Sequence, residues 1–266
     1  MPSFYVAQAL FRRFIEKMSL AYLFDVLRRY IEEFPLEFIS FAWFLVCWLG
    51  YNLVVDNYLR SSRGLSARMH LYRVQWMTVA LKRDNRVLDI NILSNLQSSI
   101  AFFASTSILI LAGLLALLGA TPQVFAILKQ IPFAEVPAKM IWYIKVFLLC
   151  FMFIYIFFKM TWSLRQLNYT SVLLGAMPLH NDPHRDHYMP TARRAAMINT
   201  MAARDMNRGL RAYYFSIAAL SWFVSPLLFM ISTGLIMVVL FRREFHSKIV
   251  QILSSPSKSV HKVDAE

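Results

Sequence analysis

Four long runs of apolar residues constrain this chain more than any other feature of its sequence. They lie at about 36–56, 98–119, 139–158 and 212–240. An α-helix needs roughly 20 apolar residues to cross a hydrocarbon core of about 30 Å, and each run is long enough. Of the 266 residues 58% are hydrophobic and 16% are charged, against about 25% charged in an average soluble domain. The sequence therefore predicts an all-α integral membrane protein with four transmembrane helices plus amphipathic surface helices.

The remaining segments divide the chain into three parts. Residues 1–33 mix aromatic and aliphatic side chains with paired charges, which predicts an amphipathic N-terminal extension. Residues 34–250 form the four-span membrane domain, and residues 251–266 form a polar C-terminal tail. The fourth span is long and contains Pro226 near its middle, where we expect a kink or local unwinding.

The net charge of +13 bears on partners and on orientation. In a chain this apolar, basic residues beside the spans are expected from topology and from anionic lipid headgroups, so no nucleic-acid partner is predicted. Segments 57–97 and 159–211 contain seven and eight Lys and Arg, whereas 120–138 contains one, which places the two long segments in the cytoplasm. With four spans both chain ends would then lie on the other side, but Arg242 and Arg243 directly follow the last span and argue against this.

A stripe of polar residues runs along the second span and the helix before it. At about 100° per residue its members fall on one face: Asp84, Asn91, Asn95, Ser98, Ser105 and Thr106. Polar side chains face lipid only at a cost, so they must face other helices or water. Alanines at 112, 116 and 120 favour helix packing, and a conduction path is the alternative.

Three charged residues lie inside the spans or near their ends. Asp56 and Arg60 are four residues apart, which predicts a local ion pair, with an acidic ring at a pore mouth as the alternative. Lys145 lies about two turns into the third span, where we expect it to snorkel to the interface.

A second basic group precedes the fourth span, where Arg204, Arg208 and Arg211 share one helical face. Such a face can bind anionic lipid headgroups, attract anions into a vestibule, or pair with acids on a neighbouring helix.

The segment HNDPHRDH at 180–187 contains side chains that can bind transition metals. On a helix His180, His184 and His187 would share a face, but Pro183 disfavours that helix, so we expect an exposed loop without metal. The sequence contains no nucleophile beside a base, no paired carboxylates within a span and no HExxH motif. We therefore expect no enzymatic activity and no cofactor.

Several blocks of sequence together resemble a known family. They are WFLVCWLGYN at 43–52, LYRVQWM at 71–77, RDNRVLDINILSNLQSSIAFFASTSILILAG at 83–113, WSLRQLNYTSVLLGAMP at 162–178, GLRAYYFSIAALSWFVSPLLFM at 209–230 and FRREFHS at 241–247. Over about residues 36–250 the chain resembles the bacterial membrane proteins grouped as domain-of-unknown-function family 599. The resemblance implies a multi-pass protein of the bacterial inner (plasma) membrane and assigns no chemistry.

Two functions remain from this reading. The first is a structural, accessory or interaction protein with a membrane protein partner. The second is a homo-oligomeric channel or transport-like protein, with a path lined by the polar face of the second span.

Overall fold

The computed structural model describes residues 28–58, 65–130, 138–179, 181–245 and 247–254. These residues form helices and connections and contain no strand, which confirms the all-α prediction. Four helices are long and apolar enough to cross a membrane, as predicted. They are α3 (Pro35–Tyr58), α5 (Val87–Gly119), α7 (Lys139–Gly175) and α9 (Pro226–Phe245). Most of the expected N-terminal extension, and the tail after residue 254, lie outside the described residues.

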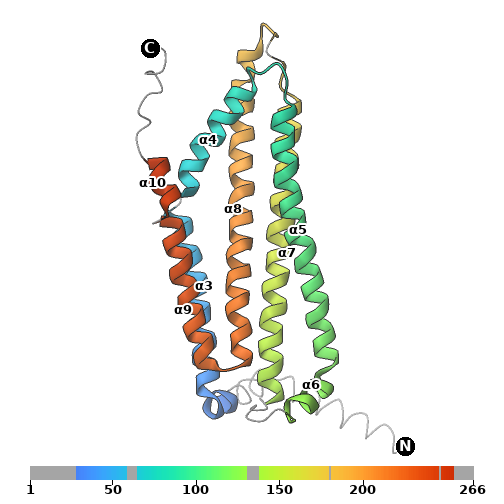
Figure 1. The fold of residues 1–266 in the computed structure, drawn as a ribbon, viewed down its shortest axis with the longest axis vertical. Coiled ribbons are helices and arrows are strands. Elements are labelled where there is room, and N and C mark those ends of the chain that lie inside the picture. Colours follow the sequence, from blue (N-terminus) through green and yellow to red (C-terminus); the bar gives the residue numbers. More distant parts are fainter. Residues whose placement is uncertain (1–27, 59–64, 131–137, 180, 246, 255–266) are drawn as a thin grey trace, which may run out of the picture.

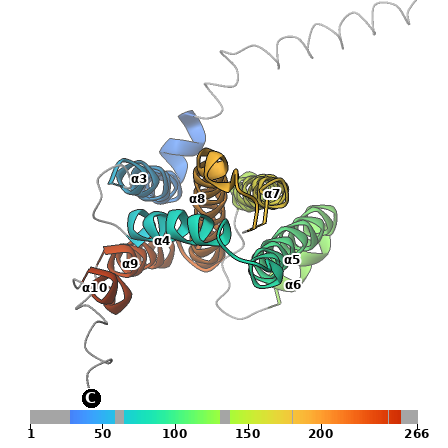
Figure 2. The same ribbon diagram turned by 90° about the horizontal axis from the view of Figure 1, so that it is seen from above.

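Shorter helices and one further long helix, polar in its first half, complete the fold. They are α4 (Leu65–Ala80), α6 (Thr121–Leu128), α8 (Met189–Leu220) and α10 (Lys248–Ser254), with 3₁₀ turns at Arg185–Tyr188 and Ser221–Phe223. α7 and α8 pack together along the centre of the bundle, α5 packs on one side of α7, and α3 and α9 lie on the other side of α8 (Figures 1 and 2).

Small residues on α8 allow this central packing. Ala195, Ala202 and Ala212 are fully buried, and alanine and glycine let helix backbones approach closely. At Gly209 a Cβ atom would lie 2.7 Å from the Cε of Met160 on α7, which is itself fully buried. A side chain at position 209 would therefore require the flexible end of the Met160 side chain to shift.

The region predicted as one kinked fourth span, 212–240, forms two antiparallel helices. α8 ends at Leu220, the chain reverses over residues 221–225, and α9 begins at Pro226 and runs back along α8 (Figure 1). Proline fits the first position of a helix because its missing N–H is not needed there. The Leu228 N–H donates to Ser225 Oγ at 3.3 Å, which helps to cap α9. The kink prediction is wrong because Pro226 begins a new helix.

This reversal removes the conflict between Arg242 and Arg243 and the orientation expected from the two long basic segments. α8 reaches the end of the bundle where α3 and α7 begin, so α3 and α9 both run from that end toward the opposite one (Figure 1). Arg242 and Arg243 therefore lie at the same end as the described basic residues of α4 and of the first half of α8. We call this the basic end. α5 and α7, of 33 and 37 residues, are about 50 and 55 Å long and project beyond a hydrocarbon core at this end (Figure 1).

Candidate functional site

The polar stripe lies on the outward face of α5. Asn91, Asn95, Ser98 and Ser105 are exposed, and Thr106 is half-buried. The opposite face of α5 packs toward α7 through buried side chains, which include Leu93, Ile100 and Ala104. Within one copy of the chain the stripe thus points away from the helix on which α5 packs. Packing against a partner and a path between copies both remain predictions.

Small residues continue the stripe toward the other end of α5. Ala112, Gly113 and Ala116 are exposed on the same face, and the large apolar side chains of Phe102 and Leu109 are interspersed among them. We refer to this surface, residues 91–116 on the exposed side of α5, as the α5 outward face.

The exposed side of α9 has a different composition. Its exposed side chains at the level of the spans are large and aliphatic: Leu227, Leu228, Ile231, Leu235, Val238 and Val239. Lipid tails suit such a surface, whereas small and polar residues are enriched where one membrane helix packs on another. The small and polar residues of the α5 outward face therefore favour helix packing, and Phe102 and Leu109 add apolar side chains to the same face.

Only part of the stripe lies at the level of the hydrocarbon core. Twenty residues of helix cover about 30 Å, so a core that begins near Gly119 ends near Ile100. Ser105 and Thr106 lie within it. The other stripe residues of α5, Asn91, Asn95 and Ser98, lie beyond it toward the basic end, as does Asp84 in the connection before α5. The Thr106 hydroxyl already donates to the Phe102 carbonyl at 2.8 Å.

Two of the predicted basic residues form ion pairs across the bundle. Arg208 donates to the Asp56 carboxylate through Nη2 at 2.8 Å and Nε at 3.0 Å, and Arg211 donates to it through Nη2 at 3.2 Å. Of the three roles expected for these arginines, pairing with an acid on a neighbouring helix is the one found. Arg60, the partner predicted for Asp56, lies outside the described residues.

A second acid continues this network to α7. Asp205 on α8 accepts hydrogen bonds from Lys159 at 3.0 Å and from Gln166 at 2.9 Å, and it lies 3.5 Å from Arg208. Asp205, Arg208 and Arg211 of α8 therefore face the interior of the bundle and join α3, α7 and α8.

Lys145 is buried, with 4% of its surface exposed, although the sequence predicts snorkelling. Its Nζ donates to Glu37 Oε1 and to the Trp222 carbonyl, both at 2.9 Å. The Trp222 indole N–H donates to the other oxygen of Glu37. Snorkelling is the wrong prediction because Glu37, in the first turn of α3, meets the lysine inside the bundle. The sequence contains one indication of this ion pair, since Glu37 lies near the start of the first span and Lys145 near the start of the third.

Arg86 is a structural residue that the sequence pattern did not single out. Its guanidinium is buried and donates to the carbonyls of Leu174 and Met177 at 2.7 Å each, and to that of Pro178. Burial lowers the pKa of Arg86, an effect that nearby Asp89 opposes. Arg86 thereby binds a carbonyl in the last turn of α7 and the carbonyls of Met177 and Pro178, which follow that helix.

The histidine segment forms a turn in its described part. Asp182 Oδ1 accepts a hydrogen bond from the His184 N–H at 2.7 Å, and the rings of His184 and His187 are 5.8 Å apart. His180 lies outside the described residues. In the part of the chain that the structure describes, no group of three His, Cys, Asp or Glu side chains could hold a metal ion.

Comparison with known proteins places this bundle in a family. Residues 39–249 match the model of the family described as Protein of unknown function, DUF599. The chain belongs to this family. The DUF599 match confirms the resemblance seen in the sequence blocks, and it covers the whole α5 outward face and the Asp56 network. No curated protein and no solved structure matches the chain.

Proposed function

We propose that this DUF599 protein is a non-enzymatic structural or accessory protein that binds another membrane protein along the α5 outward face. The supporting observation is the contrast between two exposed surfaces of one bundle. α9 presents large aliphatic side chains, whereas α5 at the same level presents Ser105, Ala112, Gly113 and Ala116 interspersed with exposed Phe102 and Leu109. Small residues permit the close backbone approach on which association of membrane helices depends.

The length of α5 extends this surface beyond the membrane. Asn91, Asn95 and Ser98 lie past the estimated edge of the hydrocarbon core, where their side chains can bond to a partner in water or in the headgroup region. A partner that follows α5 along its length would cover both the small residues and the amides. No cofactor and no nucleic acid enters this proposal.

The orientation follows from the basic end. Positively charged residues are concentrated on the cytoplasmic side of membrane proteins. We place the basic end in the cytoplasm and the chain in the bacterial inner membrane, with anionic lipid headgroups around the basic helices.

A homo-oligomeric channel is the second candidate. Its support is that the stripe faces outward, so that several copies could bring their stripes together around one axis. Against it, the stripe contributes only Ser105 and Thr106 at the level of the core, and the Thr106 hydroxyl is already bonded to its own helix. The accessory role is therefore the better-supported of the two.

Bulky residues on the α5 outward face provide the test. In the double variant Ala112→Phe/Ala116→Phe we expect the complex formed in mild detergent to dissociate, because phenylalanine prevents close helix approach. Native mass spectrometry would then show the bare chain of 31.0 kDa. The matched control, Leu235→Phe/Val239→Phe on the exposed side of α9, is expected to keep the complex. A wild-type protein that is already a bare chain, or a complex that survives in the α5 variant, would contradict the proposal.

A further inference from the structure

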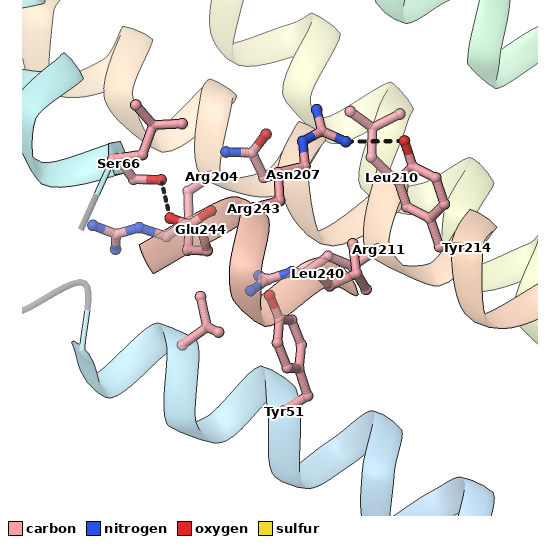
Figure 3. Close-up of a pocket in the computed structure, with 12 residues that line it drawn as sticks. Tyr51, Ser66, Arg204, Asn207, Leu210, Arg211, Tyr214, Leu240, Arg243 and Glu244 are labelled. Carbon is pink, nitrogen blue, oxygen red and sulfur yellow. Dashed lines mark hydrogen bonds between the residues drawn. The ribbon is translucent and has the colours of Figure 1, made fainter. Parts of the chain in front are cut away.

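A pocket at the basic end is lined by an excess of positive charge. It lies between α3, α4, α8 and α9 (Figure 3). Arg204 and Arg211 reach it from α8 and Arg243 from α9, while Glu244 is the one acid among its lining residues. Among the lining residues three guanidinium groups stand against one carboxylate, and Asp56 beside the lining pairs with both Arg211 and Arg208.

Arg211 is the buried cation of this pocket. Its residue is 7% exposed, its Nη2 donates to Asp56, and its guanidinium carbon lies 5.8 Å from the centre of the Tyr51 ring. Its Nε is buried and has no hydrogen-bond partner among the described residues. A buried donor without an acceptor costs free energy, so this N–H points to an acceptor beyond the described residues, which a ligand in the pocket can provide.

The other two arginines lie at the open side. Arg243 donates to the Tyr214 hydroxyl at 2.9 Å and stays exposed, and Arg204 is exposed one turn before Arg208 (Figure 3). Glu244 accepts a hydrogen bond from the Ser66 hydroxyl at 3.3 Å. Glu244 is thus engaged by a neutral donor, and Arg204 and Arg243 are exposed beside it.

The position and size of the pocket restrict the ligand. α9 has 20 residues, about 30 Å, so Arg243 near its end lies at the boundary between the hydrocarbon core and the headgroups. The cavity measures about 90 Å³, against roughly 300–1,000 Å³ for sites that enclose a whole small molecule. Val55, Leu210 and Leu240 provide apolar walls beside the arginines. The ligand must therefore place a small anionic group in the pocket.

We propose that this pocket binds a phosphate group through Arg204, Arg211 and Arg243. Guanidinium groups bind phosphate oxygens through paired, charge-assisted hydrogen bonds. The group can come from the headgroup of an anionic phospholipid in the leaflet at the basic end, or from a soluble phosphorylated compound. Arg208 does not line the pocket, since it binds Asp56, and the site does not depend on a partner at α5.

The test compares two double variants that lose the same charge. Arg204→Gln/Arg243→Gln removes both exposed cations of the pocket, whereas Arg193→Gln/Arg242→Gln removes two exposed arginines that do not line it. Delipidated protein is titrated with phosphatidylglycerol and with diacylglycerol of the same acyl chains in native mass spectrometry. Binding of inorganic phosphate is measured in parallel by equilibrium dialysis.

We expect the wild-type protein and the control variant to bind one phosphatidylglycerol about tenfold more tightly than the pocket variant, and to discriminate against diacylglycerol. If only inorganic phosphate depends on the pocket arginines, the phosphate site stands and its source is soluble. Equal binding of each probe by all three proteins, or no binding at all, would overturn the proposal. Equal unfolding temperatures of the three proteins provide the check on folding.

Discussion

Replacing Lys145 with methionine is expected to lower the free energy of unfolding by roughly 3–5 kcal/mol, the usual cost of removing one partner from a buried ion pair. The variant leaves the Glu37 carboxylate inside the bundle without its 2.9 Å cation and frees the Trp222 carbonyl from the same ammonium group. These contacts join the start of α3, the first turns of α7 and the reversal between α8 and α9. Loss of the lysine should therefore loosen the whole end of the bundle opposite the basic end.

The protein contains its own reporter for this measurement. Cys47 and Cys150 are free and buried, so a thiol-reactive fluorescent dye labels them as the bundle opens on heating in detergent. Lys139→Met, at the exposed start of the same helix, is the matched control and should unfold as the wild type does. Glu37→Gln/Lys145→Met should recover most of the loss because neither residue is charged. Equal unfolding temperatures for Lys145→Met and Lys139→Met would show that the pair contributes nothing.

Replacing Arg86 with methionine should detach the end of α7 from the connection between α4 and α5. The guanidinium bonds to the carbonyls of Leu174, Met177 and Pro178, and a methionine of similar length bonds to none of them. Hydrogen bonds from a charged group contribute about 1.5–3 kcal/mol each in favourable cases, so we expect a loss on the order of 3 kcal/mol. The damage should remain local, because α7 is held along its length by α8 and α5.

Hydrogen exchange distinguishes this local effect from general unfolding. In Arg86→Met the amides of residues 170–177 should exchange at least about tenfold faster, while those of residues 145–160 keep the wild-type rate. Lys82→Met, an exposed residue four positions earlier, is the control. Unchanged exchange at the end of α7 would mean that Arg86 does not hold this end of the helix.

The lengths of apolar runs predicted α3, α5 and α7 well, because each of these helices contains its span within one uninterrupted run. The same lengths wrongly predict one span where α8 ends and α9 begins. The apolar second half of α8 is followed after five residues by the apolar start of α9, and hydropathy alone joins them into one segment. Only tertiary contacts separate the two, for example the hydroxyls of Ser221 and Ser232, which lie 2.7 Å apart across the reversal.

The ion-pair partners of the α8 arginines could not be predicted from the sequence either. Arg208 and Arg211 bind an acid 152 and 155 residues earlier in the sequence, and a helical wheel contains no information about such a partner. The polar stripe was found because periodicity identifies residues that share a face. Periodicity does not say which face meets α7, and the structure places the buried side at Leu93 and Ile100 instead.

Site-specific photocrosslinking in native membranes tests the partner surface most directly. A photoreactive phenylalanine analogue at Ser105 is compared with one at Leu235, which lies on the exposed side of α9. The proposal predicts a discrete protein adduct from Ser105 and none from Leu235. An adduct of a mass other than twice the 31.0 kDa of the chain identifies a different protein, whereas twice that mass identifies a second copy and supports the channel instead. Absence of any protein adduct at Ser105 would contradict a partner on the α5 outward face.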